Sequence, residues 1–292
     1  MQLETQPIFT PNFSTEPDRV KMLELVAAKL RHDVVQLVQH SRSGHLGGSL
    51  SLAEVMAVLY FSVLRADPAQ PDWSGRDRLV LSKGHAAPIL FVSLARRGYF
   101  PAEWLSEHRK LNGRIQGHPD RRTPGVEVAT GSLGQGLSVV NGFMLAARID
   151  QIDQRAIAIL GDGECDEGQV WEAAMSAAHH HIPSIAIIDR NQLQIGGETE
   201  HVKRLEPLAE KWRAFGWQVI EVDGHSVPAL LNALKIAWAT PEQPTLLMAH
   251  TVKGKGVSFM ENQVEYHAKV PKEALFEQAL AELDAQVMVL EK

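Results

Sequence analysis

Two polar segments of the sequence have the residue types and the spacing to bind a metal ion together with a phosphate group. Asp162 lies between two glycines after the apolar run 156–160, and Asn191 follows the strand-like run 184–189. Both runs predict buried strands, so both side chains are expected at the carboxyl ends of strands, where open α/β sheets bind ligands. Their oxygens suit Mg²⁺, or Ca²⁺ or Mn²⁺ in its place, and the glycines let a phosphate approach the backbone.

The separation of Asp162 and Asn191 along the chain bears on whether the glycine-flanked aspartate is functional. Taken alone, a Gly-Asp-Gly triplet is more often an ordinary turn at the end of a strand. Asn191 follows Asp162 by 29 positions. This span accommodates one crossover helix and one parallel strand, which would place both side chains at the same edge of the sheet. We therefore predict Asp162 and Asn191 as metal ligands, with phosphate oxygens and water completing the site.

Four histidines follow a glycine, and three of them, His45, His85 and His118, lie in loops that precede helices in the first half of the chain. A single loop histidine is by default an ordinary surface residue. Three whose loops can face one sheet edge favour a function, because imidazole donates, accepts and transfers protons near neutral pH. The fourth, His225, follows a strand through a tight turn and is interpreted as mainly structural.

Two further reactive side chains have less decisive settings. Lys253 lies just beyond the last predicted strand, where it could meet a phosphate, although a solvated loop lysine is equally compatible with the spacing. Cys165 stands between Glu164 and Asp166, whose charges would raise the pKa of its thiol and oppose a nucleophilic role. The sequence contains neither the phosphate-binding loop of nucleotide hydrolases nor the dinucleotide glycine motif, which argues against both classes.

The elements that must position these residues alternate along the sequence. Strands are predicted over 78–82, 156–160, 184–189, 217–222 and 245–250. Helices are predicted over 16–39, from a cap at Ser49 or Ser51 to about 64, from about 88 to 97, from the glycines at 131–136 to 149, from Glu167 onward, and over 207–215, 227–239 and 271–289. We expect one α/β domain over 16–292, with a doubly wound, mainly parallel sheet and helices on both faces, preceded by an arm over 1–15.

Composition limits the class of function. The chain has 292 residues, of which 45% are hydrophobic and 22% charged, and this is typical of a globular protein. Its formal net charge of −6 argues against nucleic acid or a membrane surface as partner. No apolar run approaches the ~20 residues of a membrane helix, and the single cysteine suggests a reducing compartment, so the cytoplasm is expected. Chemistry on small molecules is favoured.

Eight motifs, in their order along the chain, resemble the amino-terminal, diphosphate-binding half of transketolase. They are SGHLGG, LSKGHAAPIL, QGHPD, ATGSLGQGLS, GDGECDEGQVWEA, DRNQLQIGG, EVDGH and TVKGKGVSFMENQVEYH. The resemblance covers about residues 25–271, and the joint occurrence of the motifs is highly specific. Transketolase is a thiamine-diphosphate enzyme of sugar phosphate metabolism, including the pentose phosphate pathway, so the resemblance implies the thiamine-diphosphate-binding fold.

The resemblance also implies roles for particular residues. Mg²⁺ would be held by Asp162, Asn191 and the carbonyl of Leu193. The cofactor would be lined by Gly131, Ser132, Leu133 and Gly163, with His85 and Lys253 near its diphosphate. The substrate and the reactive carbon would face His45, His118 and His267. Glu167 would contact the activating glutamate across a subunit interface, although an acid favoured by the helix dipole is the alternative interpretation. Two positions depart from many relatives, Leu46 after the first loop histidine and Ala268 after the last.

A complete transketolase continues into a pyrimidine-binding domain and a third domain. The resemblance therefore implies that the glutamate that activates the cofactor lies on another chain. We expect the amino-terminal subunit of a split transketolase, in a heterotetramer with a carboxyl-terminal subunit, which transfers a two-carbon ketol unit from a ketose or ketose phosphate to an aldose or aldose phosphate. Two alternatives stay open: the diphosphate-binding subunit of another thiamine-diphosphate enzyme, and a non-catalytic subunit that binds the cofactor or regulates a transketolase.

Overall fold

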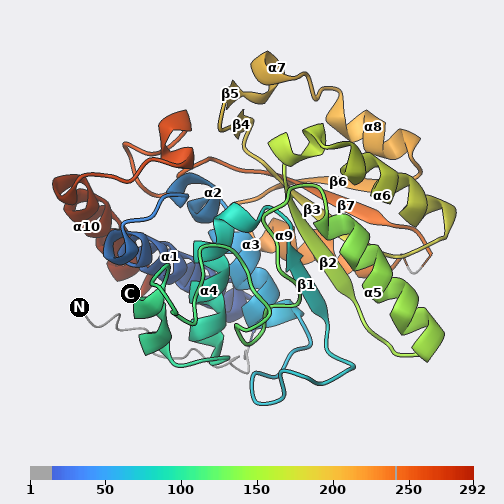
Figure 1. Cartoon of the computed structure of the whole chain (residues 1–292), viewed down its shortest axis with the longest axis horizontal. Coiled ribbons are helices and arrows are strands. Elements are labelled where there is room, and N and C mark those ends of the chain that lie inside the picture. Colours follow the sequence, from blue (N-terminus) through green and yellow to red (C-terminus); the bar gives the residue numbers. More distant parts are fainter. Residues whose placement is uncertain (1–14, 241) are drawn as a thin grey trace.

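A central sheet of five parallel strands organises the computed structural model, which describes residues 15–240 and 242–292. The strands run in the order β1-β2-β3-β7-β6 (Figure 1). Their bounds are β1 (Arg78–Leu81), β2 (Ala156–Gly161), β3 (Ile185–Arg190), β6 (Gln218–Asp223) and β7 (Thr245–His250). All five predicted strands are confirmed to within about two residues. Of the predicted arm over 1–15, only Thr15 is described, and its side chain caps the first helix.

Each central strand is buried on both faces. Along β2, Ile157 and Ile159 join one hydrophobic core, while Ala158 and Leu160 join the other. Side chains of successive strand residues point to opposite faces, so a strand covered on both sides reads as a continuous apolar run. This is why branched runs, and not alternating patterns, marked β2 and β3 in the sequence.

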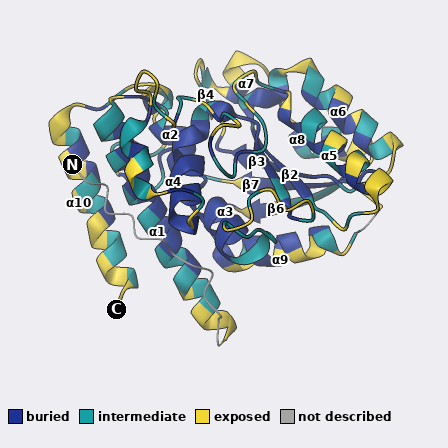
Figure 2. Cartoon of the chain, turned by 60° about the horizontal axis from the view of Figure 1, so that its bottom comes forward, coloured by how far each residue is buried: buried dark blue, intermediate teal, exposed yellow. Residues whose placement is uncertain are grey.

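Helices cover both faces of the sheet, as Figure 2 shows by the buried colour of the strands and of the inward helix surfaces. One core contains residues of α1 (Glu16–Ser41), α2 (Leu46–Leu50), α3 (Ala53–Val58), α4 (Ala87–Arg97), α9 (Val227–Trp238) and α10 (Glu273–Leu290). The other contains residues of α5 (Gly136–Asp150), α6 (Gly168–His179) and α8 (Leu208–Ala214). The predicted doubly wound, parallel α/β fold is confirmed.

The prediction of one helix that starts at a Ser49 or Ser51 cap is wrong. The helix begins earlier, at Leu46, and His45 occupies the N-cap position with a left-handed backbone (φ 74°). Ser49 Oγ donates to the carbonyl of His45 at 2.8 Å, and Ser51 Oγ donates to buried Asp189 at 2.7 Å. Ser49 Oγ therefore bonds back to the N-cap residue, and Ser51 Oγ bonds to a distant strand. Neither hydroxyl caps the start of the helix. After α2, the chain continues as α3 and then as a π-helical turn (Leu59–Val63).

Three short elements between β3 and α8 were not predicted from the sequence. They are a two-stranded hairpin, β4 (Leu193–Gln194) with β5 (Gly197–Glu198), and α7 (Thr199–Val202). Elements of two to four residues are too short to show a periodic pattern. Within the described part of the chain, no helix combines the length and the apolar character that crossing a bilayer requires.

Candidate cofactor and active site

The sheet brings Asp162 and Asn191 to one edge, as their spacing predicted. Parallel pairing of β2 and β3 sets Gly161 opposite Asp189, so the residues that follow both strands emerge side by side. Asp162 is buried, and its Oδ2 accepts a hydrogen bond of 2.5 Å from the backbone N–H of Gln192, the residue after Asn191. The two predicted ligand segments are therefore in direct contact.

The oxygens gathered at this edge fit a hard divalent cation. They are the carboxylate of Asp162, the amide oxygen of Asn191 and the carbonyl of Leu193. In this structure positively charged groups already approach them, because Lys253 Nζ donates to the Leu193 carbonyl at 3.1 Å and Arg190 Nη1 donates to Asp162 at 3.3 Å. Burial raises the pKa of Asp162, and the nearby charge of Asp189 adds to the rise, so a cation would stabilise the ionised carboxylate.

The donor set resembles a magnesium site more than a zinc site. Among the described residues, no three His, Cys, Asp or Glu side chains gather as a metal-binding group. Mg²⁺ is commonly held by one or two carboxylates, with waters and phosphate oxygens as its other ligands. A cavity of about 380 Å³, lined in part by Asn191 and Leu193, lies beside these donors. It offers space for ligands that the chain itself does not supply.

Glu164 ties the glycine-rich loop to the turn after β2, whereas the sequence indicated only that it neighbours Cys165. Its buried carboxylate accepts hydrogen bonds from the backbone of Gly134 at 2.8 Å and of Gly161 at 2.9 Å, and from the hydroxyl of Ser82. These three donors belong to separate segments of the chain. Glu164 therefore sets the position of the loop that contains the predicted cofactor contacts.

Three predicted cofactor contacts, Gly131, Ser132 and Leu133, lie on that loop, and a fourth, Gly163, lies in the turn after β2. Gly131 has a φ of 143°, which strongly favours glycine, and a Cβ there would lie 3.1 Å from the His118 ring. Ser132 is exposed and Leu133 half-buried. Gly163 is half-buried, and a Cβ on it would approach Gln194 Cβ to 2.7 Å. Small residues are thus required at two of the four positions, which keeps the backbone accessible.

Four histidine rings converge next to this loop. The ring centroids of His45 and His85 are 5.5 Å apart, those of His85 and His267 are 4.8 Å apart, and those of His45 and His118 are 6.5 Å apart. The three loop histidines therefore do face one region, as predicted from their loops. His267, which only the family resemblance had indicated, completes the cluster.

The histidine cluster is electrically neutral at physiological pH. Burial lowers the pKa of His45 to about 4, of His85 to about 2 and of His267 to about 3, and the charge of Lys253 lowers all three further. A neutral imidazole has one donor and one acceptor nitrogen. Nδ1 of His267 is buried and has no hydrogen-bond partner among the described residues. The cluster can therefore donate hydrogen bonds to hydroxyl groups and accept hydrogen bonds from them.

Lys253 is buried, which excludes the alternative of a solvated loop lysine. Only 2% of its surface is exposed. Burial lowers its pKa to about 8, and the charge of Lys83 contributes to the shift. An ammonium group in this setting lacks full solvation, so an anion such as a diphosphate would stabilise it.

Three other predicted roles can be compared with the structure. Glu167 is exposed at the N-cap of α6, and its carboxylate makes no hydrogen bond or ion pair with the described residues. Burial, with the charges of Glu164 and Asp162, raises the pKa of Cys165 well above its usual range, which disfavours a nucleophile. His225 accepts a hydrogen bond from the backbone of Val252 at 2.9 Å and contacts Glu54 at 2.9 Å, as expected of a structural residue.

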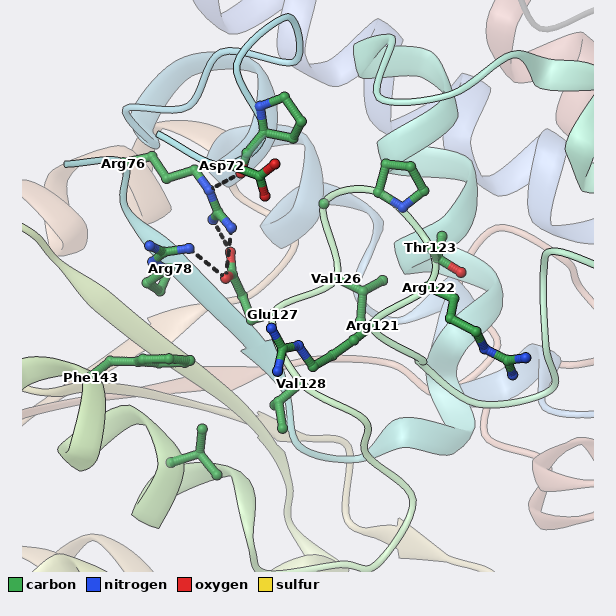
Figure 3. Close-up of a pocket in the computed structure, with 14 residues that line it drawn as sticks. Asp72, Arg76, Arg78, Arg121, Arg122, Thr123, Val126, Glu127, Val128 and Phe143 are labelled. Atoms are coloured by element: carbon green, nitrogen blue, oxygen red, sulfur yellow. Dashed lines mark hydrogen bonds and ion pairs between the residues drawn. The ribbon is translucent and has the colours of Figure 1, made fainter. Parts of the chain in front are cut away.

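A larger cavity, of about 680 Å³, contains none of the predicted site residues. Figure 3 shows Arg76 and Arg78 converging on the carboxylate of Glu127, with distances of 2.9 Å from Arg76 Nη2 and 3.0 Å from Arg78 Nη1. Glu127 belongs to the loop between His118 and Gly131. The ion pairs therefore anchor this loop to β1 and help to position His118 and Gly131.

The lowered histidine pKa values predict acid-sensitive folding. The unfolded chain takes up protons near pH 6.5, its ordinary histidine value, whereas folded His45, His85 and His267 resist protonation down to about pH 4, 2 and 3. Stability is therefore fully present above pH 6.5 and is lost as the pH falls below it. Urea unfolding of the cofactor-free chain should show a lower midpoint at pH 5 than at pH 7.5.

Urea unfolding of two variants at the same pH values tests whether the buried histidines cause the difference in midpoint. His85→Gln should reduce the difference between the two pH values, because it removes the most strongly shifted histidine. His201→Gln, at an exposed position, should leave the difference unchanged. A midpoint that is equal at both pH values in the parent chain would contradict the prediction.

The parallel sheet, with polar residues converging at the ends of β2 and β3, defines an open α/β domain, the class that binds ligands at the carboxyl edge of its sheet. The family described as "Transketolase, thiamine diphosphate binding domain" matches residues 23–284. The chain belongs to this transketolase family.

The chain is similar to separate transketolase subunits of about its own length and to a longer transketolase. It is 45% identical over 245 residues to the 6-deoxy-6-sulfo-D-fructose transketolase subunit of Clostridium sp. (strain MSTE9), a match that covers 83% of this chain and 89% of the relative. It is 40% identical over 275 residues to an apulose-4-phosphate transketolase subunit of Phocaeicola vulgatus, a match that covers 94% and 98%. The structure of transketolase from Campylobacter jejuni matches with a TM-score of 0.83 and 30% identity, over 92% of this chain and 45% of that one.

Proposed function

We propose that this protein is the cofactor-binding subunit of a two-subunit transketolase. The observation that carries the proposal is the neutral cluster of His45, His85, His118 and His267 beside a set of mostly buried oxygens that would suit a cation. The reaction is transfer of a two-carbon ketol unit from a ketose or ketose phosphate to an aldose or aldose phosphate. The similarity to two transketolase subunits that the chain spans almost completely supports the same function.

Asp162, Asn191 and the Leu193 carbonyl would hold Mg²⁺, which would bind the diphosphate of the cofactor. Lys253 would add a positive charge to the diphosphate, and the loop 131–133 would line the cofactor. When bound, thiamine diphosphate supplies the carbon that takes up the ketol unit. His45, His118 and His267 would bind the hydroxyl groups of the sugar through hydrogen bonds to their neutral rings, whose lowered pKa values make them weak bases.

The proposal includes a second subunit that carries the pyrimidine-binding domain and the glutamate that activates the cofactor. The subunits would form a heterotetramer in the cytoplasm and act in sugar phosphate metabolism such as the pentose phosphate pathway. The two relatives named as transketolase subunits support a divided enzyme.

Co-purification tests the proposed function. The full-length chain, with an affinity tag, is purified from its native source under conditions that preserve complexes. A second protein that contains a pyrimidine-binding domain should co-purify with it. The complex should cleave a ketose donor when thiamine diphosphate and Mg²⁺ are present, and the chain alone should not. Activity of the isolated chain would contradict the division into subunits. A complex that consumes a 2-keto acid and no ketose would favour another thiamine-diphosphate enzyme.

Glu167→Ala tests the proposed interface. The exposed carboxylate makes no hydrogen bond or ion pair within the described chain, so its removal should leave the thermal stability of the isolated subunit nearly unchanged. In the reconstituted complex, the loss of a charge-assisted contact should lower cofactor activation by about tenfold or more. The measurements are the rate of ketol transfer and the dissociation constant between the subunits. Normal activation and normal assembly together would show that Glu167 is only a helix-start acid.

A further inference from the structure

Asp189, a buried carboxylate at the end of β3, lies two residues before Asn191 and has no assigned role in the site. It is completely excluded from solvent. Its Oδ2 accepts hydrogen bonds from Ser51 Oγ at 2.7 Å, Lys83 Nζ at 2.5 Å and Asn191 Nδ2 at 3.1 Å, and its Oδ1 accepts one from Thr251 Oγ1. One carboxylate therefore joins four segments of the chain at the edge of the sheet.

The contact with Asp189 decides which end of the Asn191 amide faces inward. A carboxylate paired with the Lys83 ammonium is ionised, and an ionised carboxylate accepts hydrogen bonds but donates none. The end of the amide that touches Asp189 must therefore be its NH₂ group. At the other end, the backbone N–H of Leu193 donates to Asn191 Oδ1 at 3.1 Å, which an NH₂ group could not accept. Two independent partners set the same orientation.

This orientation determines whether Asn191 can bind a cation. The amide oxygen is a ligand for Mg²⁺, whereas the NH₂ group carries only donor hydrogens and would repel the ion. Asp189 is not itself free to act as a ligand. Four side chains already donate to its two oxygens, and Lys83 neutralises its charge.

We propose that Asp189 is a positioning residue for the metal site. It acts through Asn191, by holding the amide nitrogen inward so that the amide oxygen stays available to the cation. Conserving this arrangement requires a hydrogen-bond acceptor at position 189 and not a particular charge. The inference rests on the proposed Mg²⁺ and thiamine-diphosphate site, and it extends that site to a residue that does not touch the ion.

The experiment measures Mn²⁺ binding by the full-length chain, purified with its second subunit, in the presence of thiamine diphosphate. The electron paramagnetic resonance signal of free Mn²⁺ gives the dissociation constant. The double variant Asp189→Leu, Lys83→Met removes the acceptor together with the ammonium, so that no unpaired charge is left buried. We expect its dissociation constant to rise by about 10- to 100-fold, the usual effect of removing a group that orients a metal ligand.

The matched variant is Asp189→Asn, Lys83→Met. It removes the same ion pair and has a similar side-chain size, but its amide oxygen can still accept from Asn191. We expect it to bind Mn²⁺ nearly as tightly as the parent. Thermal unfolding of both double variants verifies that each is folded, and Ser51→Ala, which removes a different donor to Asp189, should also retain affinity.

Each of three outcomes would contradict one of the claims. Equal losses of Mn²⁺ affinity in both double variants would show that the ion pair matters and the contact with Asn191 does not. Unchanged affinity in the leucine variant would show that Asn191 needs no support from position 189. If the parent complex binds no Mn²⁺, the proposed cofactor site itself fails, which the parent measurement reveals before any variant is compared.

Discussion

Replacing Asp162 with alanine should lower ketol transfer by at least about 100-fold, because loss of an outer-shell partner alone costs metal sites about 10- to 100-fold. Asp162 is the only carboxylate in the proposed ligand set. Its removal would also leave the buried Arg190 guanidinium, now 3.3 Å from Oδ2, without this counter-charge. A cation would then meet one amide, one carbonyl and an excess of positive charge.

The measurement is the rate of the assembled enzyme as a function of Mg²⁺ concentration at saturating thiamine diphosphate. Asp166→Ala is the matched control, since Asp166 lies in the same turn but contacts Gln194 at 3.1 Å and is outside the proposed ligand set. Its activity should stay close to that of the parent. If Asp162→Ala matches the parent at limiting Mg²⁺, the metal assignment is wrong.

His267→Ala should lower kcat/KM for the ketose donor by about tenfold, because the variant loses one hydrogen bond, worth about 1.4 kcal/mol, to a substrate hydroxyl. The physical reason is the state of the ring. Burial keeps His267 neutral, with a pKa of about 3, and its Nδ1 is buried with no partner among the described residues. A substrate hydroxyl could satisfy that nitrogen, and no other protein group does so in the described structure.

The control for this variant is His201→Ala, which removes an exposed histidine paired with Glu198 on the surface. It should leave kcat/KM unchanged. Thermal unfolding of His267→Ala distinguishes loss of chemistry from loss of folding. A folded variant with the activity of the parent would mean that the four rings only pack against one another.

The strands were predictable because their physical signal is local. Residues 156–160 and 185–188 are apolar and branched, and a strand buried on both faces requires such a run. The spacing from Asp162 to Asn191 was also informative, since a crossover between adjacent parallel strands has a minimum length. These two facts alone predicted the edge of the sheet and two of the proposed oxygen donors, Asp162 and Asn191, whereas the Leu193 carbonyl came from the family resemblance.

The partners of buried polar groups were not predictable. Glu164 and Asp189 read as ordinary acids in the sequence, yet besides near neighbours they accept hydrogen bonds from residues as far as 82 and 138 positions away. The helix start at Leu46 was missed for the same reason. Ser51 resembles a cap when only its neighbours are considered, but its hydroxyl is bound to Asp189 on a distant strand.

The sequence by itself determined the layered α/β fold and predicted the edge at which the proposed site lies and two of its oxygen donors, because apolar periodicity and glycine-flanked polar residues act within a short window of chain. Only the tertiary structure decided the protonation of the histidines, the burial of Lys253 and the orientation of Asn191. These properties depend on solvent exclusion and on charges brought together from distant segments. Burial lowers the pKa of His85 to about 2, and no property of the tripeptide around His85 contains that information.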